Sequence, residues 1–161
     1  MEVDPADRPM PAAAAKVKPW RRAMIMLVED DVVVARILAN ALEFAGYRVH
    51  IAATGGAACA LPPRLRPDVI ILDLMLPDMD GLALTTTLKA ITDAPIIICS
   101  DRHGQVDRVL GLRLGAADFV AKPFDLDDLQ ARIEVVMRRA RKGQETVVEP
   151  TRTTRQQQAR G

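Results

Sequence analysis

The chain has 161 residues, which is enough for one domain with a core of two or three layers. A formal net charge of +1 gives no general attraction to nucleic acid or membrane, and no apolar stretch reaches the ~18–20 residues that span a bilayer. Hydrophobic residues make up 49% of the chain but aromatic residues only 3%, so the core is expected to consist of Val, Ile, Leu and Ala.

Cys59 and Cys99 fit no metal-binding or redox pattern, and the first residues do not form a signal peptide. The cytoplasm is therefore the expected compartment. Residues 1–22 are rich in proline and predict a flexible leader, whereas residues 142–161 predict a disordered basic tail. The folded domain is expected at 23–141.

Within that domain, apolar runs alternate with segments whose apolar residues recur at helical spacing. In chain order they predict a strand at 24–28, a helix to about 45, a strand at 47–53, a short helix at 54–60, a strand at 69–73, a helix at 82–91, a strand at 96–100, a helix at 106–114, a strand at 119–121 and a last helix after 125. Either Asp30 or Asp31 can cap the first helix, and Pro62-Pro63 must end the second one early.

Five strand–helix repeats predict an α/β fold with a parallel sheet, helices on both faces and right-handed crossovers. A closed barrel needs eight such units, so an open, doubly wound sheet of flavodoxin-like order 2-1-3-4-5 is the better interpretation.

Four of the five apolar runs end at a reactive polar residue: Glu29-Asp30, Asp73, Ser100 and Lys122. In a parallel sheet these ends share one edge, where ligands of such folds bind. Three neighbouring carboxylates repel one another, and Mg²⁺ would remove that conflict. An aspartate can also attack a phosphoryl group, with Lys122 as a cation and Ser100 as a hydrogen-bond donor.

Taken singly, each of these residues has an ordinary explanation. Asp30 resembles a helix cap, Asp73 a residue before a Pro/Gly turn, Ser100 a turn hydroxyl and Lys122 a solvated surface lysine. Caps and turns do not readily place all of them at successive strand ends, which favours a joint functional role.

The motifs MLVEDD, DVIILDLMLPDMDG, PIIICS and GAADFVAKPF resemble the receiver domain of two-component response regulators over about residues 24–141. The resemblance implies that Asp73 is the phosphoacceptor for a histidine kinase, with Ser100 and Lys122 beside the phosphoryl group. It implies Mg²⁺ binding by Glu29, Asp30, Asp73 and the backbone carbonyl of Met75, and a cis Lys122–Pro123 bond.

The resemblance also implies a switch. Phe119 corresponds to the aromatic residue that turns inward when the hydroxyl residue, here Ser100, moves toward the phosphoryl group. The segment 106–133 most resembles the subgroup with winged-helix DNA-binding output, which dimerises on the face formed by the fourth helix, fifth strand and fifth helix. The resemblance implies two ion pairs between subunits, Arg108 with Asp128 and Asp118 with Arg132. Ala117 replaces an acidic residue of a third pair.

Three departures from the pattern stand out. Asp101 follows Ser100 where a small residue is usual, so slower phosphorylation or a weaker switch is expected. Pro62-Pro63 shortens the second helix. Only 20 residues follow Arg141, too few for an output domain, which indicates a stand-alone receiver or a piece of a longer regulator. The basic tail alone is not expected to bind nucleic acid specifically.

Two other function classes are less favoured by the sequence. A phosphatase of the haloacid-dehalogenase type also uses a strand-end aspartate, but it needs an acid two residues later, where this chain has Met75. An adaptor that does not depend on phosphorylation would not need the full set of site residues.

Overall fold

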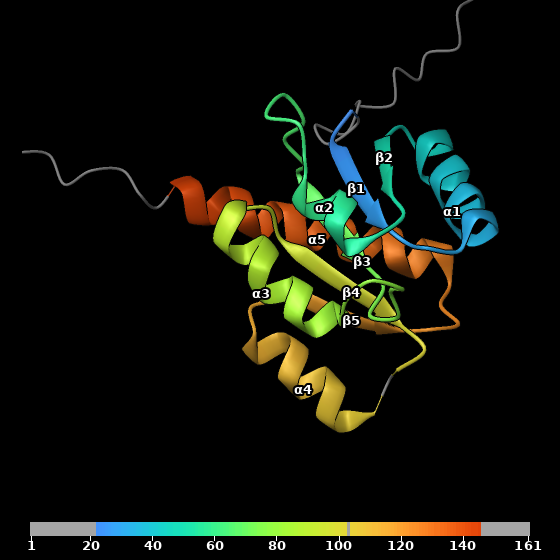
Figure 1. Cartoon of the computed structure of the whole chain (residues 1–161). Helices are drawn as coiled ribbons and strands as arrows, with labels where there is room; N and C mark the ends of the chain where they lie inside the picture. Colours follow the sequence, from blue (N-terminus) through green and yellow to red (C-terminus); the bar gives the residue numbers. More distant parts are fainter. Residues whose placement is uncertain (1–21, 103, 146–161) are drawn as a thin grey trace, which may run out of the picture.

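A computed structural model describes residues 22–102 and 104–145 (Figure 1). Strands and helices alternate in that part of the chain. The strands are β1 (Met24–Val28), β2 (Arg48–Ala52), β3 (Val69–Leu72), β4 (Ile96–Ser100) and β5 (Asp118–Ala121). The helices are α1 (Val32–Phe44), α2 (Gly55–Cys59), α3 (Gly81–Ile91), α4 (Gln105–Arg113) and α5 (Leu126–Glu145).

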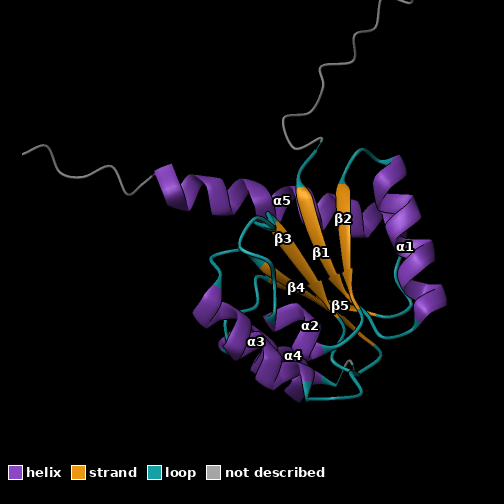
Figure 2. Ribbon diagram, turned by 45° about the horizontal axis from the view of Figure 1, so that its top comes forward, coloured by secondary structure: helices purple, strands orange, loops and turns teal. Residues whose placement is uncertain are grey.

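The strands form one parallel sheet of order β2-β1-β3-β4-β5, which confirms the predicted topology. Figure 2 shows the helices in two layers, with α1 and α5 on one face of the sheet and α2, α3 and α4 on the other. Since β1 lies between β2 and β3, the order of the strands reverses beside it. The carboxyl ends of β1 and β3 are therefore adjacent, at the place where open α/β sheets bind ligands.

The core has two parts because successive strand side chains point to opposite faces. On β1, Ile25 and Leu27 pack with buried residues of α1 and α5, whereas Met26 and Val28 pack with those of α2 and α3. Most of these side chains are aliphatic, as the composition predicted. Because apolar residues are needed on both faces of the central strands, β1 and β3 are continuous apolar runs without an alternating pattern.

Side-chain caps fix where the helices begin. Asp31 caps α1, since its Oδ1 accepts hydrogen bonds from the N–H groups of Val33 and Val34 at 2.9 and 3.1 Å. The sequence left open whether Asp30 or Asp31 has this role. Asp31 leaves the side chain of Asp30 available for the site.

The ends of some elements differ from the expected positions. Strand β3 stops at Leu72, so Asp73 lies just beyond the strand instead of within it. Helix α5 continues to Glu145, four residues past the expected end of the folded domain at Arg141. These last residues have no apolar side chain to reveal a helix, but Lys142 suits the negative end of the helix dipole. The predicted leader, except Arg22, and the rest of the tail lie outside the described residues.

Candidate functional site

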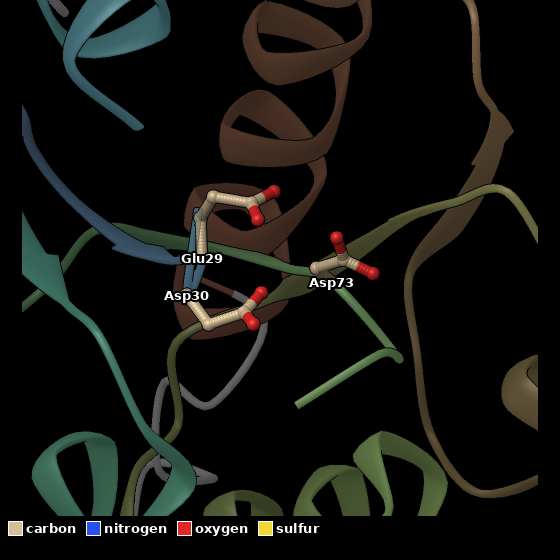
Figure 3. Close-up of side chains that lie close together, drawn as sticks. All are labelled: Glu29, Asp30 and Asp73. Atoms are coloured by element: carbon tan, nitrogen blue, oxygen red, sulfur yellow. The ribbon is translucent and has the colours of Figure 1, made fainter. Parts of the chain in front are cut away.

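Three carboxylates meet where β1 and β3 end. The main chain continues the sheet pairing past both strands, since Glu29 N–H donates to the carbonyl of Ala52 at 3.1 Å and Asp73 N–H to that of Val28 at 3.0 Å. Carboxylate oxygens of Glu29, Asp30 and Asp73 lie within 4.8 Å of one another. Figure 3 shows the three side chains gathered at the edge of the sheet.

The three acids differ in their exposure to solvent. Glu29 and Asp73 are 5% and 6% exposed, whereas Asp30 is an exposed residue. The cluster thus has a buried side and an open side. A ligand that enters from solvent would contact the exposed Asp30 before it reaches the buried Asp73.

Lys122 supplies the positive charge of this site. Its Nζ donates to Asp73 Oδ2 at 2.8 Å and to Glu29 Oε2 at 2.9 Å. The lysine follows β5, where its N–H donates to the carbonyl of Ser100 at 3.0 Å, and the Lys122–Pro123 bond is cis, as the resemblance implied. Burial lowers the pKa of Lys122, but the hydrogen bonds and charges of Asp73 and Glu29 outweigh it and raise the pKa overall.

The lysine does not neutralise the site. Burial raises the pKa of Glu29, although Lys122 and the Asp31 N–H, which donates to Glu29 Oε1 at 3.1 Å, act in the opposite direction. When all three carboxylates are ionised, one ammonium group leaves two negative charges uncompensated. Oxygen donors in this number and charge fit a divalent hard cation such as Mg²⁺.

Met75 is placed beside the cluster by its backbone. Its N–H donates to Asp73 Oδ1 at 2.9 Å, and Met75 forms an isolated antiparallel bridge with Asp80. These contacts hold the loop after β3 close to Asp73. A role for the Met75 carbonyl as a metal ligand stays a prediction.

The two predicted switch residues, Ser100 and Phe119, are both buried. Ser100 ends β4 with no solvent exposure, and its Oγ accepts a hydrogen bond from the N–H of Arg102 at 3.1 Å. Phe119 is 3% exposed and belongs to the core cluster that contains Leu82 and Ile98. A Cβ atom on Gly111 of α4 would lie 3.6 Å from the Phe119 ring, so α4 packs close to this aromatic side chain.

The acids of both predicted intersubunit pairs contact the same arginine within one chain. Arg132 Nη1 lies 2.9 Å from Asp118 Oδ2, and its Nε lies 3.0 Å from Asp128 Oδ2. Arg108 is exposed on α4. Pairing of these residues between subunits stays a prediction.

The sequence interpretation did not single out Asp78, Asp80 or Arg102. These residues lie with Asp30 around an open hollow of about 560 Å³ beside the cluster. The two Asp78 carboxylate oxygens accept hydrogen bonds from the N–H groups of Gly55 and Gly56 at 2.9 and 2.8 Å, and these bonds lower the Asp78 pKa. The only available signal for Asp78 and Asp80 was their place in the loop after Asp73.

Among the described residues, no helix combines the length and the apolar character that crossing a membrane requires.

Residues 25–134 match the family model described as "Response regulator receiver domain". Among curated proteins, the chain is 38% identical over 122 residues to "Probable transcriptional regulator ycf27" of Porphyridium aerugineum, which covers 76% of this chain and 51% of that protein. It is 40% identical over 118 residues to "Response regulator MprA" of Mycobacterium leprae, covering 73% of this chain and 52% of the relative. The chain thus spans about half the length of these relatives.

Solved structures of receiver domains are similar as well. The BeF3-activated N-terminal receiver domain of Klebsiella pneumoniae RstA matches with a TM-score of 0.68 and 30% identity, over 71% of this chain and 98% of that one. A CheY-like receiver domain protein of Methanospirillum hungatei matches with a TM-score of 0.71 and 28% identity, over 76% and 98% of the two chains.

Proposed function

Because the chain belongs to the response regulator receiver domain family, we propose that it is a phosphorylation-controlled switch in which Asp73 accepts a phosphoryl group from a histidine kinase. The observation that carries this proposal is the position of Lys122 Nζ, 2.8 Å from Asp73 Oδ2 and 2.9 Å from Glu29 Oε2. This contact holds one carboxylate oxygen of the buried Asp73 beside the Lys122 ammonium group, within a cluster of oxygen atoms that can bind a metal.

The proposed reaction is a phosphoryl transfer. A carboxylate oxygen of Asp73 forms a bond to phosphorus while the bond from phosphorus to the donor's histidine nitrogen breaks. The electron pair of that bond leaves with the nitrogen. Lys122 stays beside the acceptor and balances part of the charge that the phosphoryl group brings.

Mg²⁺ is the proposed cofactor, held by Glu29, Asp30, Asp73 and the carbonyl of Met75. When bound, it would neutralise charge on phosphoryl oxygens, a task for which the lysine alone is insufficient. The fit depends on the two negative charges that Lys122 leaves uncompensated.

We propose that Ser100 and Phe119 carry the signal to the face of α4, β5 and α5. Ser100 would rotate toward the new phosphoryl group, and Phe119 and α4 would repack. Dimerisation on that face through Arg108 with Asp128 and Asp118 with Arg132 requires Arg132 to exchange partners that it already has. Such half-exposed pairs contribute only ~0–1 kcal/mol each, so their main contribution would be to orientation.

The proposal also covers how phosphorylation of this chain would affect other molecules. Two of the matched relatives are named a probable transcriptional regulator and a response regulator, and the chain corresponds to about half of each. We propose a cytoplasmic signalling role, without enzymatic activity toward other substrates. Phosphorylation would act through partners or through a second copy, rather than through specific nucleic-acid binding by this chain.

Two features weigh against the other function classes. The chain lacks the second acid that a phosphatase of the dehalogenase type needs, because Met75 stands two residues after Asp73. An adaptor independent of phosphorylation would have no use for a buried aspartate and glutamate that share one lysine.

Intact-mass spectrometry tests the proposal. The wild-type protein is incubated with Mg²⁺ and acetyl phosphate, beside Asp73→Asn and a wild-type sample with EDTA. One added phosphoryl mass is expected only on the wild type incubated with both Mg²⁺ and acetyl phosphate. An unmodified wild type, or equal labelling of Asp73→Asn, would overturn the proposal. Size-exclusion chromatography of the labelled sample tests dimerisation separately.

A further inference from the structure

Arg102 connects three parts of the molecule that surround the acidic cluster. Its backbone N–H donates to Ser100 Oγ at 3.1 Å. Its guanidinium group contacts two carboxylates, with Nη1 3.1 Å from Asp80 Oδ1 and Nη2 3.0 Å from Asp107 Oδ1. One residue thus joins the end of β4, the loop after β3 and the first turn of α4.

Each of these partners is itself linked to the acidic cluster or to the face of α4, β5 and α5. Asp80 forms the bridge with Met75, whose N–H donates to Asp73 Oδ1. Asp107 lies in the first turn of α4, the helix that packs near Phe119. Arg102 also borders the hollow beside Asp30. Arg102 is therefore linked to Asp73 through Asp80 and Met75, and to α4 through Asp107.

We propose that Arg102 is a positioning residue that forms an ionic clasp in the unphosphorylated state and holds Ser100 and the start of α4 in their resting places. This proposal rests on the proposed function, since the clasp regulates phosphorylation of Asp73. The planar guanidinium group suits the task because it can engage two carboxylates in fixed directions.

The clasp opposes the switch for a geometric reason. If Ser100 Oγ turns toward a phosphoryl group on Asp73, the N–H of Arg102 loses its acceptor. The side chain of Arg102 remains tied to α4 through Asp107, so a shift of this loop must pull on α4 or break the ion pair. Opening the clasp thus becomes part of the cost of phosphorylation.

The effect should be moderate. The side chains of Arg102, Asp80 and Asp107 are 39%, 50% and 24% exposed, and solvent screens their charges. We expect loss of the clasp to accelerate labelling about 3- to 10-fold, the range in which a pair of partly exposed ion contacts shifts an equilibrium.

Four variants separate the clasp from simple charge effects: Arg102→Gln, Asp107→Asn, the double variant, and Asp101→Asn as a matched control. Asp101 is an exposed neighbouring acid for which the structure shows no hydrogen bond or ion pair with the described residues. The double variant keeps the net charge of the wild type. If only charge mattered, it would be labelled by acetyl phosphate at the wild-type rate.

The experiment has two measurements, the rate of labelling by acetyl phosphate and hydrogen–deuterium exchange of the α4 amides without phosphodonor. The clasp predicts faster labelling of both single variants, a double variant that is faster than the wild type but no faster than the faster single variant, and faster exchange at the start of α4. Asp101→Asn should exchange there like the wild type.

Three results would overturn the clasp: slower labelling of Arg102→Gln, a double variant at the wild-type rate, or unchanged exchange in α4. A wild type that is never labelled would contradict the proposed function instead, and the exchange measurement would still report on the contacts of Arg102.

Discussion

Lys122 and Asp73 are 49 positions apart in the chain, yet Lys122 Nζ lies 2.8 Å from Asp73 Oδ2. Their contact depends on the order of the strands, which places β3, β4 and β5 side by side with their carboxyl ends together. The same lysine reaches Glu29 at the end of β1. A single side chain thus ties the middle of the sheet to its edge strand.

Replacing this lysine should destabilise the protein in a pH-dependent way. Lys122→Ala leaves Glu29 and Asp73 buried without their cation, which should lower the free energy of unfolding by about 1–3 kcal/mol near neutral pH. At about pH 5 the loss should be smaller, because Glu29, whose pKa is raised by burial, can take up a proton instead. Urea unfolding without Mg²⁺ at both pH values measures this, and an equal loss at both would contradict the role of the lysine.

The raised pKa of Glu29 predicts how Mg²⁺ binding depends on pH. Burial raises this pKa above the ordinary 4.5, so the folded state binds more protons than the unfolded state, and stability without Mg²⁺ should fall as the pH rises from about 4.5 through the folded-state pKa. Mg²⁺ needs ionised carboxylates, so its stabilising effect should grow over the same interval.

Thermal unfolding with Mg²⁺ or EDTA, at about pH 5 and about pH 8, tests this dependence. We expect the larger increase in Tm at the higher pH. Glu29→Gln should reduce the increase and flatten its pH dependence. A larger Mg²⁺ effect at the lower pH would contradict the assignment of Glu29.

Gly81 should tolerate no side chain. A Cβ atom there would lie 2.4 Å from Leu74 Cα, and the backbone of Leu74 cannot move without disturbing the loop that follows Asp73. Gly81→Ala should therefore destabilise the protein by about 3 kcal/mol. Gly143→Ala is the matched control, because nothing lies within 4 Å of its Cβ position in α5. The control should be stabilised by about 0.5–1 kcal/mol in urea unfolding.

Asp101 should slow the entry of anionic phosphodonors. Its side chain is exposed next to Ser100, where its negative charge repels an incoming phosphoryl group. Asp101→Ala should raise the rate of labelling by acetyl phosphate about 2- to 5-fold at low salt, and less at high salt. Asp93→Ala removes the same charge after α3, beside a hollow lined by Pro62 and Pro63. If both variants changed the rate equally, the effect would not come from the position of Asp101.

The fold and the acidic cluster could be predicted because they depend on short-range patterns. Continuous apolar runs marked the buried strands, and the polar residues after three of the runs marked the edge where Glu29, Asp30, Asp73 and Lys122 meet. Parallel pairing then placed these ends together without any knowledge of side-chain contacts.

Features that depend on long side chains were harder to predict. Arg102 lies in a loop, and nothing local shows that its guanidinium group reaches Asp80, 22 positions earlier. The sequence drew attention to Asp101 instead. Likewise, two acids in a row could cap α1, and only the backbone geometry shows that Asp31 does so.

Mapping the modified residue tests the central claim most directly. After incubation with Mg²⁺ and acetyl phosphate, borohydride reduction converts an aspartyl phosphate into homoserine, which peptide mass spectrometry can locate. The account predicts homoserine at position 73 in the wild type and none in Asp73→Asn. Homoserine at another acidic residue, or at none, would contradict the assignment of Asp73 as the phosphoacceptor.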